Sequence, residues 1–228
     1  MNRLILLRHG QSEWNLENRF TGWTDVRLSA KGEEEARSAG KKIKESGLTP
    51  NFYFTSYLRR AIHTLQIAAD VMERDWIPVT KDWHLNERHY GALQGLNKKD
   101  TANKFGEEQV HEWRRGFDER PPLLTIDDPR WPGNDPKYSA LSADEIPCSE
   151  SLHDTIARVR CCWEERIIPA LRHYNDVMVV AHGNSLRALI MMLRHLSADE
   201  IQKVELPTGS PLVLELDERI NVLNQYYL

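Results

Sequence analysis

The sequence predicts an α/β fold, with a mainly parallel sheet flanked by helices. Three short apolar runs, at 4–7, 52–55 and 177–181, have the length and composition of buried strands. Stretches with helical periodicity follow these runs along the chain. Because strands that alternate with helices form parallel sheets, the order of the elements indicates this fold class.

The first half of the chain alternates strand and helix twice. After the strand at 4–7 comes a helical stretch, for which Ser29 is the expected N-cap and Gly47 the expected end. The strand at 52–55 is followed by apolar residues at helical spacing: Leu58, Ala61, Ile62, Leu65, Ala68, Ala69 and Met72. This stripe predicts an amphipathic helix with one face towards the core.

Residues 84–150 break this pattern. Six of the 11 prolines of the chain lie between Pro121 and Pro147. Short helices are expected near 98–113, and most of the segment should be irregular. Long irregular segments of compact domains usually carry function. We therefore interpret residues 1–228 as a single domain, with this segment inserted over the functional site.

Regular structure is expected to resume at Ser151. This residue and Asp154 resemble a capping box, and the helix that they start should kink or end at Pro169. The clearest buried strand, at 177–181, precedes another apolar helical stripe, and a last strand is expected at 212–216.

Composition argues against several classes of protein. With 228 residues, 40% hydrophobic and 28% charged, the chain can bury a core like an ordinary globular domain. Thirty basic and 34 acidic residues leave a net charge of −4, so duplex nucleic acid is not an expected partner. The longest aliphatic run, at 188–193, is far shorter than the roughly 20 residues that cross a membrane. Neither a signal peptide nor a membrane partner is therefore expected.

The cysteines agree with a cytoplasmic location. Cys148, Cys161 and Cys162 are odd in number, and two of them are adjacent. This spacing suits neither a disulfide framework nor a zinc site. We expect reduced thiols that serve in packing.

Two strand ends carry the same chemical pattern. One strand runs into Arg-His-Gly at 8–10, and the other runs into His-Gly-Asn at 182–184. Ligands of open parallel sheets bind outside the carboxyl ends of the strands, so the two imidazoles approach one another if the strands are neighbours. Two histidines and an arginine at that edge predict a pocket for an oxyanion, with phosphate as the expected one.

With these motifs and several others, the chain resembles the histidine phosphatase superfamily. Within it, the chain is similar to the phosphoglycerate mutases that are primed by 2,3-bisphosphoglycerate. The motifs lie at 6–15, 18–23, 55–64, 85–98, 113–117 and 181–188. The first and last mark the superfamily, and those around Glu87 and Arg114 mark the mutase branch. The resemblance implies a phosphoglycerate mutase-like fold whose inserted segment covers the active site.

The resemblance also implies which residues carry the phosphoryl group. His9 would be the nucleophile that becomes phosphohistidine, which requires a neutral imidazole. Arg8, Arg60 and His182 match the phosphate pocket, where positive charge offsets the charge of the phosphoryl oxygens. Motif register assigns this role to Arg60, although the residues alone do not separate it from Arg59.

Glu87 matches the general acid and base of the family. Such a group moves a proton between the substrate hydroxyl and the phosphohistidine in each half-reaction, and a carboxyl beside a phosphate should have a raised pKa. The local sequence leaves a second interpretation open, in which Glu87 forms a structural ion pair with Arg88.

Other matched positions are expected to contact the substrate. A phosphoglycerate carries roughly three negative charges, so a protein of net charge −4 must gather cations locally to bind it. On local sequence alone, Lys98 and Arg114 fit a solvated helix face equally well. The expected contacts are Gly10, Gln11, Ser12, Asn15, Thr21, Gly22, Arg88, His89, Tyr90, Lys98, Arg114, Arg115, Gly183 and Asn184.

The leading hypothesis is a glycolytic and gluconeogenic isomerase that interconverts 2- and 3-phosphoglycerate. It uses 2,3-bisphosphoglycerate as the priming phosphoryl donor. No metal is expected, because no histidine pair has an established metal-site spacing. A phosphatase of the same superfamily shares the core motifs and differs in that water accepts the phosphoryl group. A binding module without turnover is disfavoured, because it needs no nucleophile.

Two further expectations concern assembly and closure. Members of the family are commonly oligomeric, so we expect a homo-oligomer, most simply a dimer. The last expected strand is followed by few residues, so the inserted segment, rather than a C-terminal tail, is expected to close the site.

Overall fold

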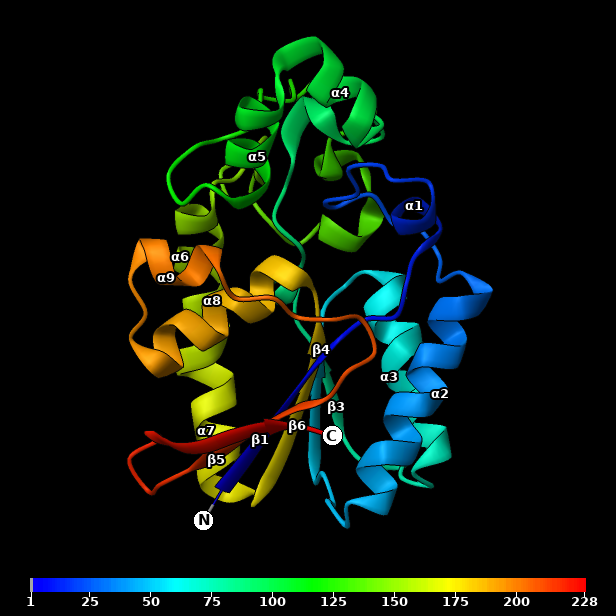
Figure 1. Cartoon of the computed structure of the whole chain (residues 1–228), viewed down its shortest axis with the longest axis vertical. Coiled ribbons are helices and arrows are strands. Elements are labelled where there is room, and N and C mark those ends of the chain that lie inside the picture. The colour runs from blue at the N-terminus through cyan, green and yellow to red at the C-terminus, as the bar shows by residue number, and fades with distance from the viewer. Residues whose placement is uncertain (1) are drawn as a thin grey trace.

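The computed structural model describes residues 2–228, in which six strands form one sheet in the order β3-β2-β4-β1-β5-β6 (Figure 1). Three of the five strand pairings are parallel and two are antiparallel. The α/β class with a mainly parallel sheet is therefore confirmed. The strands are β1 (Asn2–Arg8), β2 (Phe52–Thr55), β3 (Val79–Lys81), β4 (Asp176–Ala181), β5 (Leu212–Leu216) and β6 (Val222–Tyr227).

Helices cover both faces of the sheet, and the alternation of side chains along β1 shows why. Leu4 and Leu6 pack in the apolar cluster on one face, whereas Ile5 and Leu7 pack in the cluster on the other. Each of the four side chains is at most 1% exposed, as a strand between two helical layers requires. The first face is covered by α6 (Leu152–Cys162) and α8 (Gly183–Arg194), and the second by α2 (Ala30–Glu45) and α3 (Arg59–Val71).

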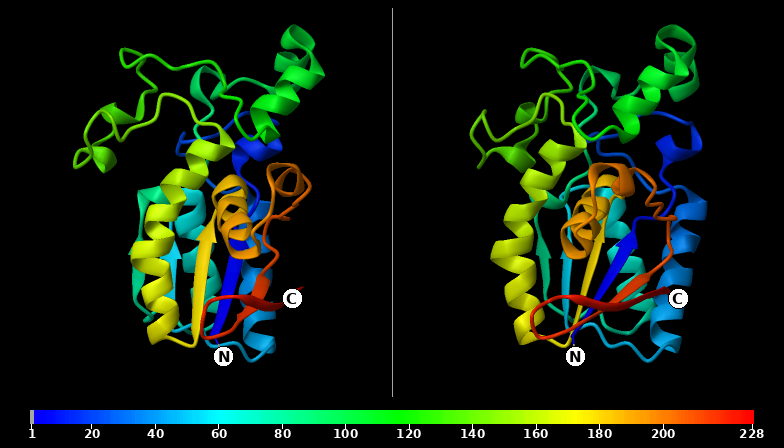
Figure 2. Two further views of the ribbon diagram at one scale, coloured as in Figure 1. Left: turned by 90° about the vertical axis from the view of Figure 1, so that its left-hand side faces the viewer. Right: turned by 60° about the vertical axis from the view of Figure 1, so that its left-hand side comes forward.

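The segment 84–150 lies above the carboxyl ends of the parallel strands (Figures 1 and 2). It contains two short helices close to the expected range and is otherwise mostly irregular. Its apolar clusters also include Phe20 and Trp23, from outside the segment. The two helices are α4 (Lys98–Phe105) and α5 (Glu107–Arg115), and the other short α-helices of the described residues are α1 (Glu13–Leu16), α7 (Ile168–His173) and α9 (Ala198–Gln202). Short 3-10 turns lie at Trp83–Leu85, Gly91–Leu93, Pro132–Asn134 and Pro136–Tyr138.

Helix ends follow the local signals of the sequence. Ser29 accepts a hydrogen bond from the Gly32 amide at the start of α2, and Gly47 adopts a φ of 75° just beyond its end. Ser151 and Asp154 form the expected capping box at the start of α6.

Pro169 does not end its helix. A π-helical turn at Trp163–Ile167 joins α6 to α7, and α7 continues to His173 with the proline in its first turn. Proline lacks an amide hydrogen and crowds the carbonyl four residues earlier. The π turn includes the residue four before Pro169, and its wider backbone makes room for the proline ring, so the helix continues instead of stopping.

Two strands do not show in the sequence pattern. β3 has only three residues, and β6 is an edge strand that lies almost wholly exposed. The prediction that 212–216 is the last strand is therefore wrong. Without a buried face, β6 shows no alternation of apolar and polar residues. None of the helices within residues 2–228 is long and apolar enough to cross a membrane.

Candidate active site

Strand register brings the two motif histidines together. β1 and β4 are parallel neighbours in which Arg8 pairs with Ala181, so His9 and His182 are the next residues along the two strands. The His9 amide donates to the Ala181 carbonyl over 3.0 Å. The two ring centroids are 5.0 Å apart. The expected approach of the two imidazoles is confirmed.

His9 is held as a neutral imidazole. Its Nδ1 lies 2.6 Å from the Gly10 carbonyl oxygen, and the ring is buried. Because a carbonyl only accepts hydrogen bonds, Nδ1 carries the hydrogen and Nε2 keeps a free lone pair. Burial, and then the charges of Arg60 and Arg8, lower the pKa of His9 well below 6.5. The imidazole is therefore uncharged at neutral pH, with its one hydrogen on Nδ1.

His182 is also neutral in the protein alone. Its Nε2 lies 2.7 Å from the hydroxyl oxygen of Ser56, which follows β2. Burial first, and then Arg60 and His9, lower the pKa of His182 well below 6.5. The expectation that His182 contributes positive charge is therefore wrong for this state, because burial disfavours its protonated form. Among the described residues, its buried Nδ1 has no hydrogen-bond partner, and His182 does not line the neighbouring cavity, which Gly183 and Asn184 reach.

The structure separates the two adjacent arginines at the start of α3. Arg60 is 1% exposed and donates from Nη1 to the Thr24 carbonyl at 2.9 Å and from Nη2 to the Gly22 carbonyl at 2.7 Å. Burial lowers the pKa of Arg60 to about 10, so it stays charged at neutral pH. Arg59 instead lies with its Nε 3.8 Å from Oδ2 of Asp25, and its side chain is partly exposed.

One cavity of about 110 Å³ collects most of the expected site residues. Cations outnumber carboxylates on its wall, so it has a positive local field in a protein of net charge −4. Burial, Arg114 and Arg8 lower the pKa of Lys98 to about 8. The expected residues on the wall are Arg8, His9, Asn15, Thr21, Gly22, Arg60, Glu87, Tyr90, Lys98, Arg114, Arg115, Gly183 and Asn184.

Glu87 faces this cavity rather than Arg88. Its Oε1 accepts hydrogen bonds from the backbone amides of Arg88, at 2.8 Å, and Asn184, at 3.1 Å. The Arg88 guanidinium points elsewhere and donates to the carbonyls of Gly116, Glu119 and Glu150. The alternative of a structural Glu87–Arg88 ion pair is therefore wrong.

Five expected substrate contacts lie behind the wall: Gly10, Gln11, Ser12, Arg88 and His89. The Ser12 hydroxyl accepts a hydrogen bond from the backbone amide of Asn15 and caps α1. The backbone amide of Gln11 donates to the Glu35 carboxylate. His89 accepts at Nδ1 from the Gly91 amide. These polar groups are used within the protein, whereas the buried Nε2 of His89 has no partner among the described residues, and none of the five residues lines the cavity.

Sequence reasoning missed four residues of the wall: Arg187, Val204, Glu205 and Leu206. A signal existed for Arg187, because it lies three residues after Asn184 on α8 and so shares its helix face. Its Nη1 donates to Asn184 Oδ1 at 3.0 Å. The other three lie on the connection after α9, which Arg8 holds by donating to the Leu206 carbonyl. No local pattern marks that connection.

The site geometry agrees with a comparison of the sequence with protein families. A model of the histidine phosphatase superfamily (branch 1) matches residues 4–126 and 124–227. The chain belongs to this superfamily. It therefore belongs to a family of enzymes. Within residues 2–228, no three His, Cys, Asp or Glu side chains are grouped so that they could hold a metal ion.

Solved structures of other proteins have the same fold. A mycobacterial glucosyl-3-phosphoglycerate phosphatase in complex with VO3 is 24% identical, with a TM-score of 0.73 over 100% of this chain and 97% of that chain. An alpha-ribazole phosphatase from Shigella flexneri is 20% identical, with a TM-score of 0.72 over 97% of this chain and 94% of that chain. At these identities the likeness shows the fold alone.

Proposed function

We propose that this superfamily member is a phosphoglycerate mutase, which interconverts 2- and 3-phosphoglycerate through phospho-His9 after priming by 2,3-bisphosphoglycerate. The observation that supports this most is the second group of cations, Lys98, Arg114 and Arg115, in the same cavity as Arg8. A bisphosphoglycerate has anionic groups at both ends of a short molecule. Two groups of cations suit such a ligand, whereas a monoester with a neutral leaving group needs only one.

The nucleophile acts first. Nε2 of His9 attacks the phosphorus of the donor, so that a P–N bond forms as the P–O ester bond breaks. Arg8 and Arg60, which both line the cavity, offset the charge on the three phosphoryl oxygens. The backbone oxygens that hold Arg60 fix its guanidinium before the substrate arrives.

Glu87 moves the proton. It gives a proton to the alkoxide that leaves, and in the second half-reaction it takes one from the hydroxyl that attacks phospho-His9. A Cβ atom placed on Gly183 would lie 3.7 Å from Oε2 of Glu87 and 3.6 Å from Nε of Arg8. The free carboxylate oxygen therefore lies close to the phosphoryl pocket, while Oε1 is held by backbone amides.

A phosphatase is the second candidate function. The names of the similar solved structures, a glucosyl-3-phosphoglycerate phosphatase and an alpha-ribazole phosphatase, favour it. In a phosphatase the same His9 would accept the phosphoryl group, and Glu87 would activate water instead of a substrate hydroxyl. The two functions differ in the acceptor alone.

Intact mass spectrometry tests both candidates. The protein is incubated with 2,3-bisphosphoglycerate and a chelator, and then with 3-phosphoglycerate. We expect one phosphoryl group on the native protein, none on His9→Asn, and steady formation of 2-phosphoglycerate. Release of inorganic phosphate with little 2-phosphoglycerate would identify a phosphatase. A requirement for added metal would contradict both.

A further inference from the structure

A buried ion pair lies beneath the segment that carries Glu87, and the chemistry above does not use it. Arg158 of α6 donates from Nε to Glu150 Oε1 at 2.7 Å and from Nη2 to Glu150 Oε2 at 2.8 Å. The two side chains are only 7% and 5% exposed. Such a pair is weak evidence of stabilisation, because desolvation offsets its attraction. Its other contacts indicate a more specific role.

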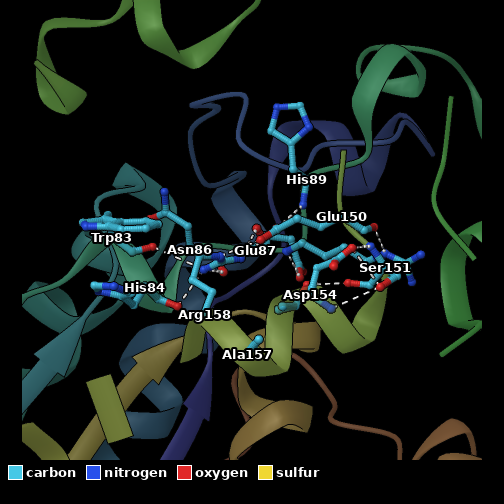
Figure 3. Close-up of polar contacts among 12 residues, drawn as sticks. Trp83, His84, Asn86, Glu87, His89, Glu150, Ser151, Asp154, Ala157 and Arg158 are labelled. Atoms are coloured by element: carbon cyan, nitrogen blue, oxygen red, sulfur yellow. Dashed lines mark hydrogen bonds and ion pairs between the residues drawn. The ribbon is translucent and has the colours of Figure 1, made fainter. Parts of the chain in front are cut away.

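The Arg158 guanidinium donates hydrogen bonds to the backbone of residues 83–87, here called the Glu87 segment, as Figure 3 shows. Its Nη1 donates to the carbonyls of His84, at 2.6 Å, Asn86, at 3.2 Å, and Trp83, at 3.3 Å. Its Nη2 donates to the carbonyl of Glu87 itself, at 3.2 Å. After the short 3-10 turn that ends at Leu85, no helix or strand orders this backbone until Gly91. A side chain from α6 takes the place of that regular structure.

Glu150 holds the segment from the other side. Its Oε2 accepts a hydrogen bond from the His89 amide at 2.9 Å, and its own amide donates to the His89 carbonyl at 2.9 Å. Its carbonyl accepts from Nε of Arg88 at 2.7 Å. The backbone is therefore fixed both at Glu87 and two residues later (Figure 3).

We infer that the Arg158–Glu150 pair is a positioning unit for Glu87, which sets the backbone from which the Glu87 carboxylate enters the cavity. The inference rests on the proposed role of Glu87 in proton transfer. Neither Arg158 nor Glu150 lies on the cavity wall, so they act through the segment that they hold. A displacement of about 1 Å in a reacting group can reduce a rate by about a hundredfold.

The test compares two phosphoryl donors in single-turnover phosphorylation of His9. The alkoxide that leaves from 2,3-bisphosphoglycerate needs a proton, whereas the phenolate that leaves from p-nitrophenyl phosphate does not. The variants are Glu87→Gln, Arg158→Lys and Glu150→Gln. Arg158→Lys keeps the charge but not the planar set of donors, and Glu150→Gln keeps an acceptor for the His89 amide but not the charge.

The control is Arg120→Lys. Arg120 lies outside α6 and forms an ion pair with Asp154, which is on the same helix as Arg158; both of its N–O distances are 2.6 Å. The Arg120 side chain is mostly exposed and makes no contact with the Glu87 segment. It therefore reports the effect of weakening an ion pair on α6 without moving Glu87.

A positioning role predicts selectivity between the donors. Arg158→Lys and Glu150→Gln should slow transfer from 2,3-bisphosphoglycerate by about tenfold or more and transfer from p-nitrophenyl phosphate by less than about twofold. Glu87→Gln should show the same selectivity, and adding Arg158→Lys to it should cost little more. Arg120→Lys should leave both rates near those of the native protein.

Other outcomes would overturn the inference. Equal slowing with both donors, or full additivity with Glu87→Gln, would make the pair structural only. If a thermal melt shows that Arg158→Lys does not fold, Glu150→Gln decides by the same comparison. A native protein that takes no phosphoryl group from either donor would overturn the proposed function itself, and with it the inference.

Discussion

Arg59 and Arg60 are identical in chemistry and adjacent in sequence, yet only one lies in the cavity. Consecutive residues of a helix point about 100° apart, so one of the two must turn away from the site. The carbonyls of Gly22 and Thr24 hold Arg60, and Asp25 lies beside the partly exposed Arg59. Contacts with the loop 22–25 thus hold Arg60, and not Arg59, at the cavity.

Matched lysine substitutions test this difference. Arg60→Lys keeps a positive charge, but its single nitrogen replaces the two separate nitrogens that bond the carbonyls of Thr24 and Gly22, and it lacks the planar spread of donors that a guanidinium presents to the phosphoryl oxygens. We expect His9 phosphorylation to slow by about a hundredfold, and Arg59→Lys to remain within about twofold of the native rate. Quenched-flow samples weighed as intact protein give both rates. Similar losses in the two variants would contradict the assignment.

The start of α8 is the element that brings backbone close to the phosphoryl pocket. α8 begins at Gly183, directly after His182, and its first amides lie at the cavity. The positive end of a helix favours an anion at this position. A Cβ on Gly183 would meet Arg8 and Glu87 only at ordinary contact distances of 3.6 and 3.7 Å. On Gly10, by contrast, a Cβ would overlap the backbone of Gly32.

Alanine at Gly183 should therefore affect substrate binding, whereas alanine at Gly10 should affect the free energy of unfolding. Gly183→Ala should fold with a free energy of unfolding within about 1 kcal/mol of the native value, but its methyl group occupies the cavity and should raise KM for 3-phosphoglycerate by about tenfold. Gly10→Ala should lower the free energy of unfolding by about 3 kcal/mol or more. Urea unfolding and steady-state kinetics measure the two effects. An unchanged KM for Gly183→Ala would place the substrate elsewhere.

The elements found from the sequence are those with a local signal. The buried strands around Leu4 and Val177 and the polar residues that follow them are visible in a few letters each, so the core of the site could be predicted. The connection at Leu206 could not, because its place depends on a contact with Arg8 that is 198 residues away in sequence. Arg158 was hidden for a similar reason, since it bonds carbonyls that carry no side-chain information.

At the scale of the whole molecule, the cations of the cavity and the elements that carry them meet at the carboxyl ends of the parallel strands. The segment 84–150, which lies above the strands (Figure 2), contributes Lys98, Arg114 and Arg115 to the cavity wall, and the end of β1 contributes Arg8 and, directly after it, His9. Arg115 also pairs with Glu205 at 2.8 Å, which links α5 to the connection after α9. The cavity is therefore assembled from parts that are distant in sequence, and it requires the complete fold.

Burial of the nucleophile has a consequence for the stability of the whole molecule. His9, His89 and His182 are all buried with lowered pKa values, chiefly through desolvation, and that of His89 falls to about 3. In the unfolded chain each takes up a proton near its ordinary pKa of 6.5. Below that pH the unfolded state binds more protons than the folded state, so the free energy of unfolding must fall as the pH falls.

His89→Gln tests this linkage without touching the cavity wall. Each buried neutral histidine should add about 1.4 kcal/mol per pH unit to the loss of stability below its unfolded pKa. For His89 the loss should run from about pH 6.5 down to about pH 3, the limits set by its unfolded and folded pKa values. Urea unfolding at about pH 6 and about pH 4.5 should therefore show a slope shallower by about 1.4 kcal/mol per pH unit in the variant. An unchanged slope would mean that His89 is protonated in the folded protein. The slope that remains would come in part from His9 and His182. Because the proposed chemistry requires a neutral His9, a nucleophile that is reactive at neutral pH brings with it a loss of stability in acid.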